Sequence, residues 1–454
     1  MNNKLSFAIV TLLFFLWGFI TCMNDILIPY VKSAFQLSYA KAMLVQFAFF
    51  MAYFVGSLVY FVVSAFAGDP INKIGYKAGI VAGLVTASVG LALFYPAAKI
   101  QSYGFFLTAL FVLGLGFTLL QIAANPYVAI LGPPKTASAR LNLAQGFNSF
   151  GTTIAPLIGG YLIFQMFGGQ SNVGAEAVKT PYLFFSVVTL SIALFFSIVK
   201  LPAFTNTEKV DQAAKAFQFP QLSFGIIAIF MYVGGEVAMG SMLTSYVGLK
   251  EVANLPPIKA SMYVALYWGG LMIGRFTGSA VLGNFSNIRK AIMAFSVPIV
   301  ISTLLSGIFY IKGTNIKELI YYIPFIFILG LGFVVAKFKP ARTLMTFAII
   351  NVALSLISIT TNGKTALFSV IAAGLFNSIM WGNIFTLAIY NLGKYTSQGS
   401  ALLVMGILGA AIIPIIQGAI ADHIGVHLSY LVPIFCFGYV AWYAWMQRNL
   451  IAEI

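Results

Sequence analysis

The chain has 454 residues, of which 60% are hydrophobic and only 8% are charged, and its mean hydropathy is +0.96. Soluble domains carry about 25% charged residues, so this composition excludes a soluble protein and indicates a polytopic membrane protein. The net charge of +15 does not indicate nucleic-acid binding, because the basic residues are scattered among short connectors.

Apolar runs long enough to cross a bilayer recur along the whole chain. Six precede the longest polar connector, and they are predicted at 7–31, 41–65, 78–97, 103–130, 141–167 and 181–200. Eight follow it, at 219–247, 259–283, 290–311, 318–337, 341–360, 365–391, 399–421 and 429–448. The predicted domains are an N-terminal six-helix half at 1–201, a cytoplasmic linker at 202–218 and a C-terminal half at 219–454.

An internal repeat relates the two halves. The segment GTTIAPLIGG at 151–160 aligns with GAAIIPIIQG at 409–418. Farther upstream, Tyr53 and Gly56 align with Tyr267 and Gly270. In the eighth span, the repeated glycines Gly270, Gly274 and Gly278 predict a close approach to a neighbouring helix.

The two extra spans of the second half predict an insertion. The offset between matched positions grows by about 45 residues, which is roughly two bilayer spans with their connectors. We therefore expect a transmembrane hairpin at about 289–339, between the eighth and ninth core helices. The predicted fold is all-α with fourteen spans, in which two six-helix halves are related by a pseudo-two-fold axis. This pattern resembles the major facilitator fold.

The distribution of lysine and arginine predicts the orientation. If both termini are cytoplasmic, more of the basic connector residues fall on the inner side than on the outer side, as the positive-inside rule requires. We expect a multi-pass protein of the plasma membrane, the inner membrane of a bacterium.

Two acidic residues lie inside predicted spans, Asp25 in the first and Glu236 near the centre of the seventh. A carboxylate at the centre of a spanning helix costs about 2.5 kcal/mol or more, so such residues ordinarily mark ion, proton or substrate pathways. The alternatives are a snorkelling or salt-bridged Asp25 and a structurally partnered Glu236. The other eight acids, Asp69 among them, fall in connectors, at helix ends or near the C-terminus. The sequence predicts proton coupling by Asp25 and Glu236.

Polar and aromatic residues inside several spans predict a sugar site. Amides suit such a site because they donate hydrogen bonds to hydroxyl groups and also accept hydrogen bonds from them. The fourth and fifth spans contribute Gln121, Asn125, Asn142, Gln145 and Asn148. The C-terminal half contributes Tyr232, Asn377, Trp381 and Asn383. Hydrogen bonding between helices is the alternative for each amide, and packing is the alternative for the aromatic residues.

The connector after the second span contains Gly68, Asn72 and Gly75 and resembles the gating motif of major facilitators. Asn72 stands where that motif ordinarily has an aspartate. A charge relay through Asn72 therefore does not transfer from the family to this chain.

Several motifs resemble the fucose/glucose/galactose symporter branch of the major facilitators. They are NDILIP at 24–29, QIAANPY at 121–127, LNLAQGFNSFG at 141–151, GRFTG at 274–278 and NLG at 391–393. The resemblance runs nearly the length of the chain, apart from the predicted hairpin. It implies that Asn24 contacts substrate and that Arg275 takes part in gating.

The same resemblance implies uptake of a hexose, glucose or galactose, by cation symport with protons through alternating access. Fucose members carry an acid at each of the positions of Asp25 and Gln121, whereas a glutamine cannot titrate. The two-carboxylate mechanism therefore does not transfer intact. A fucose or N-acetylglucosamine symporter, and coupling to sodium, remain the alternatives.

A membrane-embedded glycosyltransferase or polymerase is the alternative from another class, but the connectors are short for binding a soluble donor. The two histidines, His423 and His427, lack a surrounding ligand cluster, so no metal site is predicted. We expect a monomer that is not an enzyme, has no cofactor and does not bind nucleic acid. Its partners are a monosaccharide, the coupling ion and the lipid bilayer.

Overall fold

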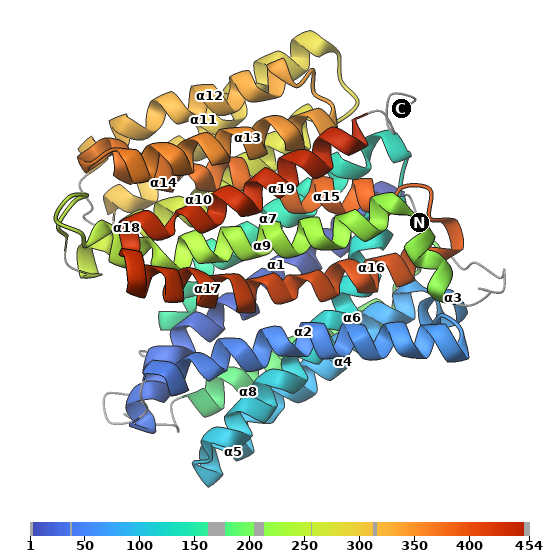
Figure 1. Cartoon of the computed structure of the whole chain (residues 1–454). Coiled ribbons are helices and arrows are strands. Elements are labelled where there is room, and N and C mark those ends of the chain that lie inside the picture. The colour runs from blue at the N-terminus through green and yellow to red at the C-terminus, as the bar shows by residue number, and fades with distance from the viewer. Residues whose placement is uncertain are drawn as a thin grey trace. The chain divides into compact units, whose positions relative to one another are not determined.

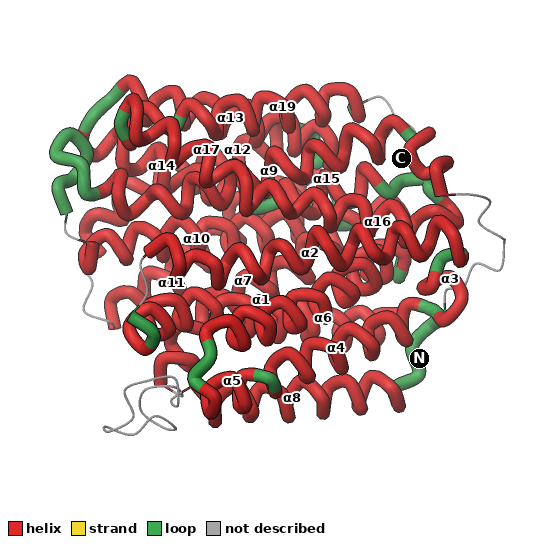
Figure 2. The backbone as a smooth tube through the Cα atoms, turned by 60° about the horizontal axis from the view of Figure 1, so that its bottom comes forward, coloured by secondary structure: helices red, strands yellow, loops and turns green. Residues whose placement is uncertain are grey.

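A computed structural model describes residues 3–36, 39–161, 178–203, 213–255, 257–311 and 316–448. These residues are nearly all helical and contain no strand (Figure 2). The first part of the chain forms α1 (Asn3–Ala34), α2 (Tyr39–Ala67), α3 (Pro70–Ile74), α4 (Tyr76–Ala92), α5 (Phe94–Ile100), α6 (Tyr103–Ile130), η1 (Pro134–Thr136), α7 (Ala137–Tyr161) and α8 (Lys179–Ile198).

The second part forms η4 (Ala213–Gln218), α9 (Pro220–Val247), α10 (Pro257–Val281), α11 (Asn287–Ile311), η5 (Ile316–Tyr322), α12 (Ile323–Val335), α13 (Pro340–Thr360), α14 (Gly363–Asn377), α15 (Met380–Ala388), η6 (Gly393–Tyr395), α16 (Thr396–Met405), η7 (Gly406–Leu408), α17 (Gly409–Ile424), α18 (Val426–Ser429) and α19 (Leu431–Gln447). Among the described residues, eleven helical stretches are long and apolar enough to cross a membrane. The predicted total of fourteen spans stays a prediction.

The helices gather into two compact units, neither of which is continuous in sequence. Unit 1 contains Met1–Leu131, Phe150–Leu222 and Asn391–Ala411. Unit 2 contains Gly132–Ser149, Ser223–Tyr390 and Ile412–Ile454. The first part of α7 therefore belongs to unit 2, and the segment with α16 belongs to unit 1. The predicted domain boundaries at 201 and 219 stay predictions.

Unit 1 is built around α6, which packs against α2 and α4, while α4 also packs against α8. Small residues bring α4 and α6 together, because a Cβ atom on Gly83 would lie 2.8 Å from the Leu120 nitrogen and 2.9 Å from the Gly116 carbonyl oxygen. Gly90 is equally close to the backbone of Leu113. Such a backbone-to-backbone contact leaves no space for a side chain.

We expect Gly83→Ala to lower the melting temperature of the purified protein, because the added methyl group meets backbone that cannot rotate away. Overpacking of this kind costs about 1–3 kcal/mol. Gly104→Ala, in the first turn of α6, is the matched control, since a Cβ there meets nothing within 4 Å. Equal melting temperatures for the two variants would contradict the close approach of α4 and α6.

Unit 2 repeats this arrangement with different helices. Here α14 packs against α10 and α13, and α13 also packs against α19. The predicted close approach of the eighth span is confirmed: a Cβ on Gly270 would lie 2.9 Å from the Leu375 nitrogen, and one on Gly274 would lie 2.7 Å from the Leu375 carbonyl oxygen. In these contacts α10, α13, α14 and α19 correspond to α2, α4, α6 and α8 of unit 1.

The helices α11 and α12 have no counterpart in that correspondence. Between α2 and α4 the chain forms only the short α3, whereas between α10 and α13 it forms α11, η5 and α12. The two extra helices pack against each other, and α11 also packs against α10. Figure 1 shows them along one edge of unit 2, beside α13. This is the place at which the sequence predicts an inserted hairpin.

Candidate functional site

The predicted site residues fall in both units. Gln121 and Asn125 lie on α6 in unit 1. The remaining predicted sugar ligands except Asn24 lie in unit 2, as does Glu236 on α9. Asn24 and Asp25 lie within α1, but their side chains are outside the described part of the structure. Their predicted roles therefore stay predictions.

In unit 1, the two amides on α6 are buried with polar atoms that lack partners. Asn125 is fully buried, and neither its oxygen nor its nitrogen has a hydrogen-bond partner among the described residues. Gln121 lies beside Tyr53, and its side-chain oxygen has no hydrogen-bond partner among the described residues. A buried polar atom without a partner costs about 1–3 kcal/mol. The pair is therefore suited to a polar ligand that supplies the missing hydrogen bonds.

In unit 2, Glu236 is the centre of a buried hydrogen-bond network. The Tyr232 hydroxyl, one helical turn away on α9, donates to the Glu236 carboxylate. The Tyr267 hydroxyl on α10 donates to the Glu236 backbone carbonyl over 2.8 Å. Tyr267 in turn accepts a bond of 2.9 Å from the Asn377 amide on α14, and Asn351 on α13 donates to the Asn377 oxygen over 2.6 Å. These hydrogen bonds connect four helices of unit 2 to Glu236, and the carboxylate itself accepts the bond from Tyr232.

The buried cation nearest this network is Arg275 on α10. It interacts electrostatically with both Glu236 and Tyr232, so the carboxylate and its hydrogen-bond donor share one neighbouring cation. Its guanidinium also donates to the Ser149 hydroxyl over 2.5 Å and to the Ser378 carbonyl over 3.2 Å. The Glu236 charge is thereby linked to α7 and to the end of α14. Arg275 therefore contacts residues of two other segments as well as the network around Glu236.

Two predicted sugar ligands, Asn142 and Asn383, bind each other. The Asn142 amide donates to the Asn383 oxygen over 3.1 Å, and the Asn383 amide donates to the Pro340 carbonyl over 3.2 Å. One turn away, the hydroxyls of Ser138 and Thr386 lie 2.6 Å apart. These bonds join the start of α7 to α15. A role of either asparagine in sugar binding stays a prediction.

The other predicted ligands of unit 2 differ in their surroundings. Trp381 on α15 is buried and stacks on Phe385, and its indole N–H has no partner among the described residues. Gln145 is buried on α7, and its backbone carbonyl is 3.5 Å from the Arg275 guanidinium. Asn148 is half-buried on the same helix. Of these three residues, Trp381 has a buried hydrogen-bond donor that a ligand could use.

The predicted gating connector is held against the segment that contains α16. Gly68 and Gly75 have φ values of +80° and +84°, a conformation that favours glycine. Between them, the Asn72 amide donates to the Lys394 carbonyl over 2.9 Å. Close by, the Gln398 amide donates to the Ser64 hydroxyl over 2.7 Å. The connector thus joins two parts of unit 1 that are far apart in sequence.

Sequence reasoning missed the residue that carries most of this contact, Asp69. Its carboxylate is buried and caps α3 by accepting from the Ile71 nitrogen over 2.9 Å and the Asn72 nitrogen over 3.2 Å. The Tyr60 hydroxyl donates to it over 2.7 Å, and the Ser397 hydroxyl donates to its other oxygen. Asp69 supplies a carboxylate three residues before Asn72. Its place next to Gly68 in the predicted motif was the available signal.

We expect Asp69→Asn to loosen the segment with α16, because an amide nitrogen would face hydroxyl and N–H donors. Losing the bonds to a charged acceptor costs about 2 kcal/mol, which corresponds to roughly 30-fold faster amide exchange where local opening governs it. Hydrogen–deuterium exchange of residues 393–405 measures this. The exposed Asp422 provides the control variant, Asp422→Asn. Unchanged exchange in Asp69→Asn would contradict the proposed contact.

Sequence reasoning also missed Tyr53, Tyr267, Ser149 and Asn351. The repeat held a signal for the first two, because Tyr53 and Tyr267 are aligned positions. Each contacts a polar residue on the neighbouring helix, Gln121 for Tyr53 and Asn377 for Tyr267. No group of three or more histidine, cysteine, aspartate or glutamate residues that could hold a metal occurs in the described part of the chain.

Comparison with known proteins identifies the family. A family model of the Major Facilitator Superfamily matches residues 7–337. The chain belongs to the major facilitator superfamily. The predicted class, an all-α multi-pass membrane transporter rather than an enzyme, is thereby confirmed.

Relatives of this major facilitator resemble it over almost the whole chain. The glucose/galactose transporter of Brucella abortus (strain 2308) is 42% identical over 446 residues, which cover 97% of this chain and 94% of the relative. The L-fucose-proton symporter of Escherichia coli (strain K12) is 31% identical over 465 residues, which cover 96% and 91%. A crystal structure of the fucose symporter FucP in the outward conformation matches with a TM-score of 0.78 and 29% identity, covering 99% of this chain and 100% of that one.

Proposed function

We propose that this major facilitator takes up glucose, galactose or both by proton symport through alternating access. The substrate is supported by the 42% identity to a glucose/galactose transporter, against 31% to a fucose-proton symporter. The observation that carries the coupling is the buried Glu236 carboxylate, which accepts a hydrogen bond from Tyr232 and interacts electrostatically with Arg275. A buried carboxylate with one nearby cation can change its protonation state and alter the forces on its neighbours.

The roles in this proposal follow from the contacts within each unit. Within unit 1, Gln121 and Asn125 have buried polar atoms that lack partners among the described residues, and sugar hydroxyls would satisfy them. Within unit 2, the same holds for the indole N–H of Trp381. The Trp381 ring adds an apolar face suited to a pyranose ring. Asp25 and Glu236 exchange protons, and Arg275 transmits the charge state of Glu236. Both termini are placed in the cytoplasm, with the protein in the inner membrane of a bacterium as a monomer.

Uptake of radiolabelled glucose into proteoliposomes tests the function. An inward proton gradient should drive accumulation, an inward sodium gradient should not, and excess galactose should compete. Competition by fucose or N-acetylglucosamine but not galactose would reassign the sugar. Uptake driven only by sodium would reassign the ion. No uptake of any of these sugars under either gradient would overturn the proposal.

We expect Asn125→Leu to weaken glucose binding by about 10- to 100-fold, the effect of losing one or two buried hydrogen bonds to a ligand. The sugar-free protein should keep or raise its melting temperature, because the substitution removes polar atoms that lack partners. Isothermal titration and thermal melting measure the two effects. Asn362→Leu is the control, since Asn362 is exposed at the start of α14 and makes no capping bond. A lower melting temperature with unchanged affinity would make Asn125 structural.

A further inference from the structure

One end of the α11–α12 hairpin brings together basic side chains from three connections of unit 2. One comes from η1, two from the start of α11, two from the turn between α12 and α13, and one from the first turn of α13. They are Lys135, Arg289, Lys290, Lys337, Lys339 and Arg342, here called the basic cluster. Lys290 is half-buried and the other five are exposed. Among the described residues, none of the six has a hydrogen-bond or ion-pair partner for its side chain.

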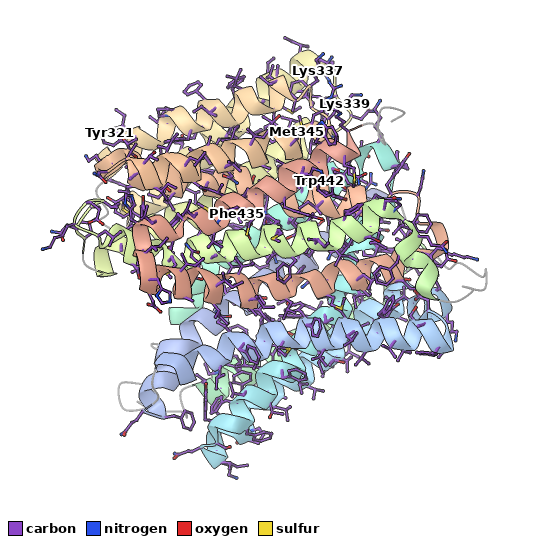
Figure 3. All side chains as sticks on the ribbon, in the orientation of Figure 1. Tyr321, Lys337, Lys339, Met345, Phe435 and Trp442 are labelled. Atoms are coloured by element: carbon purple, nitrogen blue, oxygen red, sulfur yellow. The ribbon has the colours of Figure 1, made fainter. Side chains whose placement is uncertain are left out.

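Several observations place the members of the basic cluster close to one another. The Lys290 ammonium lies 5.9 Å from the centroid of the Phe338 ring, which ties the start of α11 to the α12–α13 turn. Lys135 is close enough to repel the same ammonium group. The turn itself places Lys337 and Phe338 at φ values of +54° and +55°, a left-handed conformation that residues other than glycine seldom adopt. Figure 3 shows Lys337 and Lys339 projecting at this end and Tyr321 at the opposite end.

The described carboxylates of unit 2 do not neutralise the basic cluster. Glu236 lies in the middle of α9 within its own network. Glu251 lies near the far end of α13, because its carbonyl accepts a bond of 2.8 Å from the Gly363 nitrogen. Asp422 lies near the same end, since His427, five residues later, is 2.6 Å from the Ser358 carbonyl. The helix α13 begins beside the basic cluster and spans 21 residues, about 30 Å, before it reaches these acids.

An exposed apolar surface begins next to the basic cluster. Ile288 and Ile292 on α11 are 69% and 61% exposed, and Leu331 and Val335 on α12 are 55% and 64% exposed. The first and last of these are within two residues of Arg289 and Lys337. A soluble anion would match only the charges, whereas a phospholipid matches both surfaces. Its phosphate would meet the cations and its acyl chains would cover the apolar side chains.

We propose that this end of the hairpin is a binding site for an anionic phospholipid. The headgroup phosphate binds the basic cluster, and the acyl chains lie along α11 and α12. Because Lys135 precedes α7, a bound headgroup ties the start of α7 to the hairpin within unit 2. The helices α11 and α12, which have no counterpart in unit 1, therefore give this transporter a lipid contact of their own. This site does not depend on which sugar or ion is transported.

Native mass spectrometry of the full-length protein in a non-ionic detergent, titrated with phosphatidylglycerol, tests the proposal. Each basic residue near a membrane surface strengthens binding of an anionic lipid by about fivefold. The triple variant Lys290→Gln/Lys337→Gln/Lys339→Gln should therefore bind its first phosphatidylglycerol on the order of 100-fold more weakly than the wild type. Phosphatidylcholine, titrated in parallel, should bind both proteins equally.

The control variant removes three charges elsewhere: Lys99→Gln/Lys200→Gln/Lys250→Gln, all at exposed positions. It should bind phosphatidylglycerol within about twofold of the wild type if the effect is local. If both triple variants bind phosphatidylglycerol equally weakly, the effect comes from net charge alone and the proposed site is wrong. If millimolar inorganic phosphate displaces the lipid, the basic cluster binds a free anion and the proposed lipid site is wrong. Circular dichroism and gel filtration show whether each variant is folded before it is compared.

Discussion

Proteoliposomes that contain Glu236→Gln should equilibrate glucose but fail to accumulate it under an inward proton gradient. Glutamine has nearly the same size and still accepts the hydrogen bond from Tyr232, but it cannot exchange a proton. The internal sugar concentration should rise to the external one and no further. Counterflow, in which labelled sugar exchanges for unlabelled sugar without a gradient, should continue. Measuring both in the same preparation separates coupling from binding.

Two comparisons make this prediction decisive. Tyr232→Phe removes the hydroxyl that donates to Glu236 but keeps the carboxylate, so accumulation should weaken without being abolished. Asp25→Asn removes the other predicted proton carrier and should also prevent accumulation. If Glu236→Gln accumulates sugar as the wild type does, Glu236 is a structural acid. If Asp25→Asn accumulates sugar as the wild type does and Glu236→Gln does not, Glu236 is the residue that couples transport to protons.

The largest loss of stability should come from Arg275→Gln. The substitution leaves the buried Glu236 carboxylate without its cation. It also removes the guanidinium that donates to the Ser149 hydroxyl and to the Ser378 carbonyl. Breaking a buried pair by removing one partner costs about 3–5 kcal/mol, because the other charge is left uncompensated. The melting temperature in detergent should fall strongly. The control Arg342→Gln removes an exposed arginine and should change it little.

A double variant identifies the source of that loss. When Glu236→Gln is added to Arg275→Gln, no uncompensated charge remains, so the melting temperature should recover part of the way. An additive fall would mean that the two residues do not interact. In that case Arg275 acts through Ser149 and Ser378 alone, and the proposed transmission from Glu236 to α7 is wrong.

Features that depend on local sequence were predictable. Long apolar runs define the helices, and glycines four residues apart define a close approach, as Gly270 and Gly274 show. Glu236 was also predictable from local sequence, because placing a carboxylate inside an apolar membrane-spanning run costs free energy wherever it lies. The hairpin at about 289–339 was predicted from the change in offset between aligned segments and from the two surplus spans, and the structure has α11 and α12 in this stretch.

Features that depend on distant pairing were not predictable. Asp69 looks like an ordinary connector acid until Ser397, 328 residues later, donates to it. Asn142 and Asn383, 241 residues apart, have the same amide chemistry whether they bind a sugar or each other. Side-chain type gives the capacity for a hydrogen bond, whereas the partner is decided by the fold. The amides that bind a sugar can therefore be distinguished from those that bind each other only when the packing of the helices is known.

The composition of the two units also sets an order for biosynthesis. Unit 1 needs Asn391–Ala411, which follows its other segments in the chain. At about 5–20 residues per second, the ribosome takes on the order of ten seconds or more to reach this segment after Leu222. During that interval the surfaces of α2 and α6 that will contact α16 are without that helix. The nascent protein therefore has a period in which lipid or an insertion factor must cover them.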